Sequence, residues 1–108
     1  MKKEELTELL KPIADSITFS DHFAQKAKER GISSEEILNK IRSLDRLLLI
    51  EDQGDEPRGH KYGLLFGTTL SNYDLKVVVS IHSKSLNIIT AHLQNVKKKK
   101  AYRRWLEQ

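Results

Sequence analysis

The sequence predicts an α+β fold in which helices pack on one face of a small antiparallel sheet of three or four strands. Apolar residues recur at helical spacing in the first half of the chain, and β-branched runs joined by short turns fill the second half. Helices grouped ahead of strands favour this class over a parallel doubly wound sheet. The length of 108 residues suits one domain over residues 1–108, with residues 1–16 as an N-terminal helical extension.

Two helices are expected in the first third of the chain. Residues 4–17 carry leucines and isoleucines at helical spacing, and Pro12 should end or kink that helix. Ser20 is a good N-cap for a second helix over residues 21–30. Gly31 then supplies the left-handed residue that commonly follows a helix.

The third helix has the clearest local signature in the chain. Ser33 and Glu36 form an S-x-x-E capping box, and Ile32 and Ile37 stand where a hydrophobic staple packs. Apolar residues then continue at helical spacing to Leu44. These residues predict structure and indicate no function.

After residue 46 the pattern changes to that of strands. Short apolar or β-branched runs are separated by turn-rich stretches, and the last two runs are close enough to predict an antiparallel hairpin. The charged stretch DQGDEPRG predicts a loop, and the basic end of the chain predicts a helix. The expected strands cover residues 47–51, 61–70, 75–82 and 86–93, the loop covers 52–59, and the last helix covers 96–108.

The charge differs between the two halves of the chain. Residues 1–56 carry nine Lys/Arg and thirteen Asp/Glu, whereas residues 57–108 carry ten Lys/Arg and two Asp/Glu. A basic half indicates a polyanionic partner, and nucleic acid is the commonest one. A solvated lysine-rich tail has the same composition and is the alternative.

Several classes of protein and site are excluded by what the sequence lacks. The absence of cysteine excludes a disulfide scaffold, a thiol nucleophile and a cysteine zinc site. No apolar run approaches the roughly 18 residues that span a bilayer, and the first residues are charged where a signal peptide would be apolar. No phosphate-binding loop or clustered metal-ligand motif occurs. We expect a soluble cytoplasmic protein that uses no metal and no cofactor.

Strand alternation gathers polar side chains on one side of the predicted sheet. In residues 75–82 the odd-numbered apolar residues face the core, which turns Ser80 and His82 outward. The same reasoning turns Lys61 outward and leaves His92 among the polar members of its strand. A sheet covered by helices on one side would therefore show these residues on the other side, beside the basic tail.

Two imidazoles beside permanent cations suit metal-free cleavage of RNA. A neutral imidazole can take the proton of the ribose 2′-OH, and an imidazolium can protonate the leaving 5′-oxygen. Lysine and arginine stabilise the charge that develops on the phosphoryl oxygens, and an aromatic ring can stack on a base. The acid–base candidates are His82 and His92, the phosphate-stabilising candidates are Lys61 and Arg103, and the stacking candidate is Tyr102.

The remaining candidates each have an ordinary structural alternative. His22 lies at the edge of an apolar helical stripe, where a histidine is either active or bonded to the backbone, and His60 is expected to be an exposed loop residue. Arg103 and Arg104 would clamp phosphate or complement the dipole at the end of the last helix. Nonspecific attraction of RNA is expected from the run Lys97, Lys98, Lys99 and Lys100.

The stretch FSDHFAQKAKERGISSEEILNKI resembles the opening of a family of small bacterial and archaeal domains of unknown function. The later runs KYGLLFG, LKVVVSIH and LNIITAH look like the sheet strands of that family. The layout also resembles the BrnT toxin family and, more distantly, the RelE/ParE toxin superfamily, in which a strand ending in I-I-S-A-R leads into a basic helix. Here Ile88-Ile89-Thr90-Ala91-His92 leads into residues 96–105, and the resemblance covers about residues 17–105.

This resemblance implies a RelE-like fold that cleaves RNA and pairs with an antitoxin protein that occludes the groove. By the same resemblance His92 stands where the relatives carry an arginine, and Tyr102 and Arg103 belong to the basic last helix. His22 matches the histidine of the family of unknown function.

We therefore expect a metal-independent endoribonuclease of the toxin type with RNA as its substrate. The alternative is a non-catalytic module on the same fold that binds nucleic acid or protein, and whose N-terminal helix mediates self-association into a homo-oligomer. A third alternative is a chain whose single partner is an antitoxin-like protein. Cleavage of RNA that depends on His82 or His92 would separate the enzyme from the binding modules.

Overall fold

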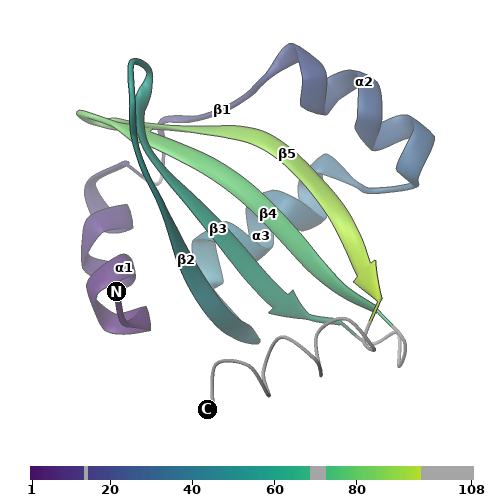
Figure 1. Ribbon diagram of the computed structural model, residues 1–108, viewed down its shortest axis with the longest axis horizontal. Helices are drawn as coiled ribbons and strands as arrows, with labels where there is room; N and C mark the ends of the chain where they lie inside the picture. The colour runs from purple at the N-terminus through teal and green to yellow at the C-terminus, as the bar shows by residue number, and fades with distance from the viewer. Residues whose placement is uncertain (14, 69–72, 96–108) are drawn as a thin grey trace.

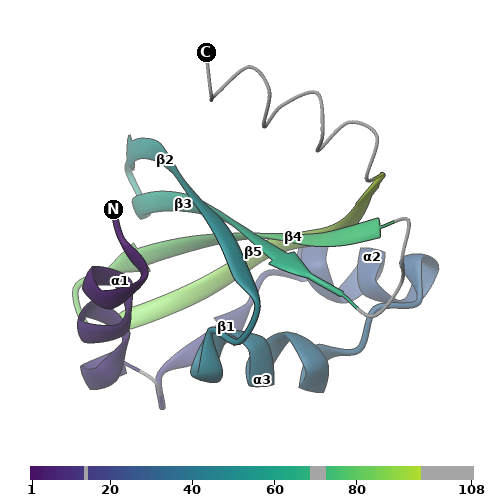
Figure 2. The same cartoon turned by 90° about the horizontal axis from the view of Figure 1, so that it is seen from below.

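The helices that the structure describes gather on one side of a β-sheet (Figures 1 and 2). The computed structural model describes residues 1–13, 15–68 and 73–95. The helices within these residues are α1 (Lys3–Leu10), the short 3₁₀ helix η1 (Lys11–Ile13), α2 (Asp21–Arg30) and α3 (Ser34–Ser43). The strands are β1 (Ile17–Phe19), β2 (Leu47–Glu56), β3 (Gly59–Gly67), β4 (Tyr73–His82) and β5 (Ser85–Asn95).

The predicted helix caps are confirmed. The Ser20 hydroxyl accepts a hydrogen bond from the backbone N–H of Phe23, and Gly31 ends α2 in the left-handed conformation at φ 64°. The Ser33 hydroxyl accepts from the backbone N–H of Glu36 at the start of α3. These local contacts fix where α2 and α3 begin, and so fix which of their faces meets the sheet.

The sheet has five strands in the order β1-β5-β4-β3-β2. All neighbouring pairs are antiparallel except β1 and β5, which run parallel. The α+β class is confirmed, but the expected three or four antiparallel strands are wrong, because the sheet is mixed and contains β1. Residue Ile17, which continues the helical spacing of the first segment, instead begins β1 and pairs with Leu86.

The expected loop over residues 52–59 is also wrong. Strand β2 continues through Glu56, and Gly59 pairs with it at the start of β3, so that Pro57 and Arg58 alone form the turn of a hairpin. Gly59 has φ 127°, and a Cβ atom placed there would lie 2.6 Å from the backbone oxygen of Ile81. The charged stretch is therefore part of a β-hairpin formed by β2 and β3 rather than a loop.

The core lies between the helices and one face of the sheet. Its residues in β3 and β4 alternate along the strand, as strand geometry predicts. The helices contribute the apolar side of each amphipathic pattern. The buried residues of this core are Leu6, Leu10, Ile13, Phe23, Ala27, Ile37, Ile41, Leu44, Tyr62, Leu64, Phe66, Leu75, Val77, Val79, Ile81, Leu86, Ile88 and Ala91.

A β-bulge in β5 decides which side chains of this strand face away from the core. The pairs Val78↔Thr90 and Val79↔Ile88 leave Ile89 as an extra residue on β5. Ile88 therefore faces the core, and two residues later Thr90 faces the opposite side. The Ser20 hydroxyl donates a hydrogen bond to the Ile89 backbone oxygen over 2.7 Å, which ties the bulge to the start of α2.

The predicted last helix, residues 96–108, lies outside the described residues, as do the candidate residues Tyr102, Arg103, Arg104 and the lysine run Lys97–Lys100. Among the residues that the structure describes, no helix combines the length and the apolar character needed to cross a bilayer.

Candidate functional site

The sheet face opposite the helices, here called the outer face, carries Lys61, His82 and His92. Strand alternation predicts this for Lys61 and His82, whereas His92 faces outward because of the bulge at Ile89. Lys61 pairs with Ser80 across β3 and β4, and His92 pairs with Lys76 across β5 and β4. Residues directly opposite each other in neighbouring strands point to the same side of the sheet. His82, on the same strand as Ser80 and Lys76 and an even number of residues away, shares that side.

The two histidines do not converge, although they share a face. Lys76 is the partner of His92, and His82 lies six residues further along β4. At about 3.3 Å per residue the backbone positions of the two histidines are about 20 Å apart along the strands, which is too far for both side chains to reach one phosphate. His82 and His92 therefore cannot serve as acid and base in the same cleavage event.

His92 lies among cations instead. Arg30, the last residue of α2, donates from Nη1 to the Thr90 hydroxyl over 3.2 Å and to the Ala91 backbone oxygen over 3.0 Å. Burial lowers the pKa of His92, and the charges of Lys76 and Arg30 lower it further. The imidazole is therefore neutral at physiological pH and is able to accept a proton.

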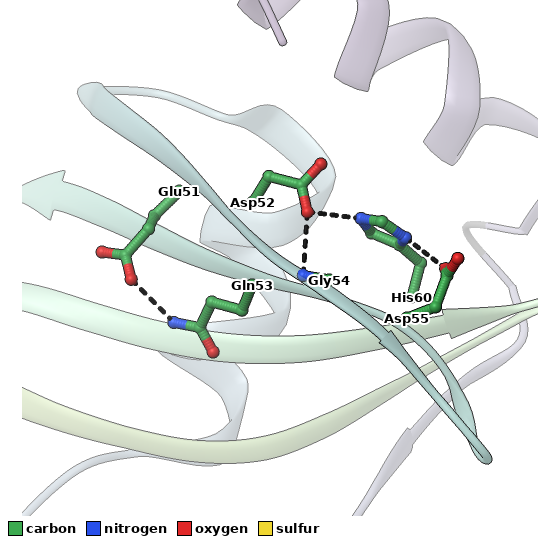
Figure 3. Close-up of polar contacts among 6 residues, drawn as sticks. All are labelled: Glu51, Asp52, Gln53, Gly54, Asp55 and His60. Carbon is green, nitrogen blue, oxygen red and sulfur yellow. Dashed lines mark hydrogen bonds and ion pairs between the residues drawn. The ribbon is translucent and has the colours of Figure 1, made fainter.

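Both outer-face lysines are held by carboxylates of the edge strand β2. Lys61 Nζ donates to Glu56 over 3.3 Å, and Lys76 Nζ lies 3.7 Å from a Glu51 oxygen. The other Glu51 oxygen accepts from the Gln53 amide over 3.3 Å (Figure 3). Within the part of the chain that the structure describes, Lys61 and Lys76 of the outer face are thus each paired with a carboxylate.

The centre of the outer face is buried rather than open. Leu65 and Val78 are each 7% exposed, and Ser80 is 6% exposed. The Ser80 hydroxyl donates to the backbone oxygen of Arg58 over 3.1 Å, so the β2–β3 turn lies against β4 at this point. The accessible polar groups of the outer face therefore surround the buried side chains of Leu65 and Val78.

The β2–β3 hairpin carries a second polar cluster, which faces the helix-covered side beside Tyr62. His60 contacts Asp55 through Nδ1 over 2.5 Å and Asp52 through Nε2 over 2.6 Å (Figure 3). The contact with Asp55, followed by that with Asp52, raises the pKa of His60. The backbone N–H of Gly54, followed by His60, lowers the pKa of Asp52. Both ring nitrogens of His60 contact carboxylates, so this cluster links β2 to β3 and leaves neither nitrogen free to act as a base.

The expectation that His60 is a free loop histidine is therefore wrong. The residue lies on β3, and a histidine flanked by acids at positions 52 and 55 could have suggested this pairing. His22 lies exposed in the first turn of α2. Across the described ranges, no group of three or more His, Cys, Asp and Glu side chains is arranged to hold a metal ion.

The sequence reasoning did not name three residues near His92 as site residues. Strand alternation places Lys76 on the same face as Ser80 and His82, but its position opposite His92 depends on the pairing of β4 with β5. Arg30 and Glu51 could not be found from alternation, because their contacts join residues far apart in the chain. All three lie in residues 1–95, which hold thirteen Lys/Arg and fourteen Asp/Glu, so the excess positive charge of the chain resides in residues 96–108.

Comparison with protein families places most of this arrangement in one known domain. The family model described as Domain of unknown function (DUF4258) matches residues 19–92. The chain belongs to this family. The DUF4258 match begins next to the N-cap Ser20, ends at His92, and includes Arg30 and Lys76. The residues before and after it, including α1 and the basic tail, lie outside the match.

No curated protein and no solved structure matches the chain. The expected family of domains of unknown function is therefore confirmed as DUF4258. The RelE-like and BrnT-like arrangement has no support from these comparisons and stays a prediction.

Proposed function

We propose that this DUF4258 chain binds single-stranded RNA at the polar groups that surround the buried centre of the outer face, and cleaves it without a metal ion, with His92 as the general base. The observation that carries the proposal is the position of His92 between Lys76, its partner across the strands, and the Arg30-bound strand edge. Its lowered pKa keeps the imidazole neutral near pH 7, which is the form that accepts a proton.

In this reaction His92 removes the proton of a ribose 2′-OH, and the 2′-oxygen attacks the adjacent phosphorus. The bond from phosphorus to the 5′-oxygen breaks, which leaves a 2′,3′-cyclic phosphate and a free 5′-hydroxyl, with solvent supplying the proton to the leaving oxygen. Arg30 and Lys76 stabilise the charge on the phosphoryl oxygens. His82 is too distant for the acid role expected from the sequence and is assigned a contact with the RNA backbone.

Residues 96–108 complete the proposal through their charge. They hold six Lys/Arg and one Asp/Glu, whereas residues 1–95 are nearly neutral. The tail therefore supplies the long-range attraction for RNA, and Tyr102 and Arg103 stay candidates for base stacking and phosphate contact. A cytoplasmic location, a RelE-like fold and an antitoxin protein that covers the outer face belong to the same proposal.

The test uses the full chain with a 5′-labelled single-stranded RNA in buffer containing EDTA. Wild-type protein is expected to produce fragments ending in 2′,3′-cyclic phosphate. His92→Gln is expected to lower the cleavage rate by about 10²–10⁴-fold, the usual contribution of a general base, with binding retained. His22→Gln is the matched control and should cleave at the wild-type rate. Equal cleavage by His92→Gln would overturn the assignment of the base.

The pH profile gives an independent reading of the same residue. Since the pKa of His92 is lowered, the cleavage rate should stay level as the pH falls past 6.5, the usual pKa of histidine, and should decrease only at lower pH. A decline that begins above pH 6.5 would show that another group is the base. RNA with a 2′-deoxy nucleotide at the cleavage position should bind and stay intact.

The distance between His82 and His92 favours a second candidate function, a module that binds RNA without cleaving it. Binding would then depend on the basic tail, and replacement of Lys97–Lys100 by alanine would weaken it and make its salt dependence shallower. RNA bound by the wild-type protein with no product after prolonged incubation would establish this candidate in place of the enzyme.

A further inference from the structure

The edge strand β2 places a carboxylate on each of the two outer-face lysines. Glu56 contacts Lys61 and Glu51 contacts Lys76, so two ion pairs of the same kind link β2 to the inner strands β3 and β4. The lysine side chains are 26% and 22% exposed, and those of their glutamates 50% and 42% exposed. Each cation is thus partly covered while its carboxylate partner lies nearer the solvent, where an incoming anion could take its place.

The position of Glu51 is fixed by its neighbours. One of its oxygens accepts from Gln53, and the side chains of Gln53 and Lys76 lie over Gly63, whose missing Cβ leaves room for them. A Cβ at Gly63 would come within 2.8 Å of the Gln53 amide nitrogen and 3.3 Å of Lys76 Cε. Glu51 is therefore held by packing and hydrogen bonding beside Lys76, the residue opposite His92.

We propose that Glu51 and Glu56 compete with the phosphates of the RNA backbone for the two outer-face lysines. They occupy Lys76 and Lys61 in the free protein, and RNA phosphates replace them on binding; this inference rests on the proposed function. Both carboxylate oxygens of Glu51 already have partners within the protein, which favours the role of competitor over that of a group that reads a base.

The spacing of the lysines defines the ligand that can displace both carboxylates. Lys61 is opposite Ser80, four residues along β4 from Lys76, so the two lysines are about 13 Å apart along the strands. In the free protein the two lysines are bound to different glutamates, so displacing both carboxylates with the lysines in place takes more than one phosphate. We therefore expect a strand carrying several phosphates to be favoured over a mononucleotide.

The experiment measures fluorescence anisotropy of a labelled single-stranded RNA with the full-length variants Glu51→Gln, Glu56→Gln and the double variant. Each single change should tighten binding by about two- to five-fold, and the double change by about ten-fold, as expected for release of exposed ion pairs. Glu8→Gln is the matched control, because Glu8 of α1 pairs with Lys11 of η1 away from the outer face, and the substitution removes the same charge. It should leave affinity nearly unchanged.

A mutant cycle identifies the lysine that is released. In a Lys76→Gln background, Glu51→Gln should no longer tighten binding, because the cation that it sets free is gone. Adenosine monophosphate should bind no variant measurably better than the wild type.

The outcomes separate this inference from the proposed function. RNA binding that is unchanged by Glu51→Gln and Glu56→Gln, equally strengthened by Glu8→Gln, or weakened by Glu51→Gln would overturn the competitor while leaving RNA binding established. Absence of binding by the wild type and all variants would overturn both. Binding by the double variant alone would support both.

Discussion

Replacement of Gly59 by alanine should be the most damaging single change in the β2–β3 hairpin. Gly59 has φ 127°, outside the left-handed helical region that other residues sometimes adopt. An added Cβ would lie 2.6 Å from the Ile81 backbone oxygen and 2.9 Å from the Cβ of His82. The chain must therefore either change the turn or move β4, and neither adjustment is a simple side-chain rotation.

The expected loss in the free energy of unfolding is about 3 kcal/mol, from a backbone conformation costing about 1–3 kcal/mol and the added overlap with β4. Gly31 provides the comparison, because it has φ 64° and a Cβ atom added there would meet nothing within 4 Å. Its replacement by alanine should cost about 1 kcal/mol. For a domain of this size these losses correspond to decreases in Tm of about 15 °C and about 5 °C.

Thermal unfolding followed by circular dichroism measures both changes. Asparagine separates the two causes, since it tolerates the left-handed conformation at Gly31 but cannot relieve the backbone contact at Gly59. Gly31→Asn should therefore melt close to the wild type and Gly59→Asn close to Gly59→Ala. Equal melting of the Gly31 and Gly59 alanine variants would refute the reasoning and with it the two-residue turn.

Three further predictions concern the His60 contacts, the cap and the core. The pKa of His60 is raised in the folded protein, so its ion pairs stabilise the fold below the unfolded pKa of 6.5, and this contribution is lost as the pH rises through the folded pKa. The urea midpoint of His60→Ala should therefore lie below that of the wild type at acid pH and approach it at alkaline pH. Ser20→Ala should cost about 1–2 kcal/mol in urea unfolding, because it removes both the N-cap of α2 and the bond to the Ile89 oxygen. Leu64 is 0% exposed and Leu48 is 41% exposed. Leu64→Ala should therefore lower the free energy of unfolding by about 2–5 kcal/mol, whereas Leu48→Ala should change it by no more than about 0.5 kcal/mol. Similar losses for the two variants would place Leu64 outside the core.

Local chemistry made the helices and the faces of the strands predictable. Ser20 and Ser33 bind backbone N–H groups within three residues, so the information needed to place these caps is contained in the local sequence. The pattern of Val77 and Val79 two residues apart likewise fixes the core side of β4 without knowledge of its partners. The same alternation placed Lys61 and His82 on the outer face.

Features that depend on distant partners were not predictable in this way. Strand β1 is three residues long, and it exists because residues 86–88 of β5 pair with it. The charged stretch of β2 resembles a loop in composition, but the antiparallel pairing with β3 and the contacts of His60 with Asp52 and Asp55 extend it as a strand. Composition identified the polarity of this segment and could not identify its partner.

The candidate site shows the same limit. Alternation put His82 on the outer face, but the outward position of His92 depends on the bulge at Ile89. The distance between the two histidines follows from the register of β4 with β5, which pairs His92 with Lys76. The contact of Arg30 with the Ala91 backbone oxygen spans 61 positions in the chain, and no local pattern marks it. His92 could be named as a candidate from the sequence, whereas the identity of its neighbours could not.

The bulge at Ile89 has a consequence for insertions and deletions in this strand. A regular strand continuing from Leu86 and Ile88 would turn His92 toward the core, and the single extra residue reverses that phase. A chain lacking Ile89 would run Ile88-Thr90-Ala91-His92 in unbroken alternation and keep His92 on the outer face, at the cost of the carbonyl that Ser20 binds. Loss of one codon is therefore tolerable at Ile89, whereas loss of the codon for Ala91 with the bulge kept would exchange the two faces in the rest of β5.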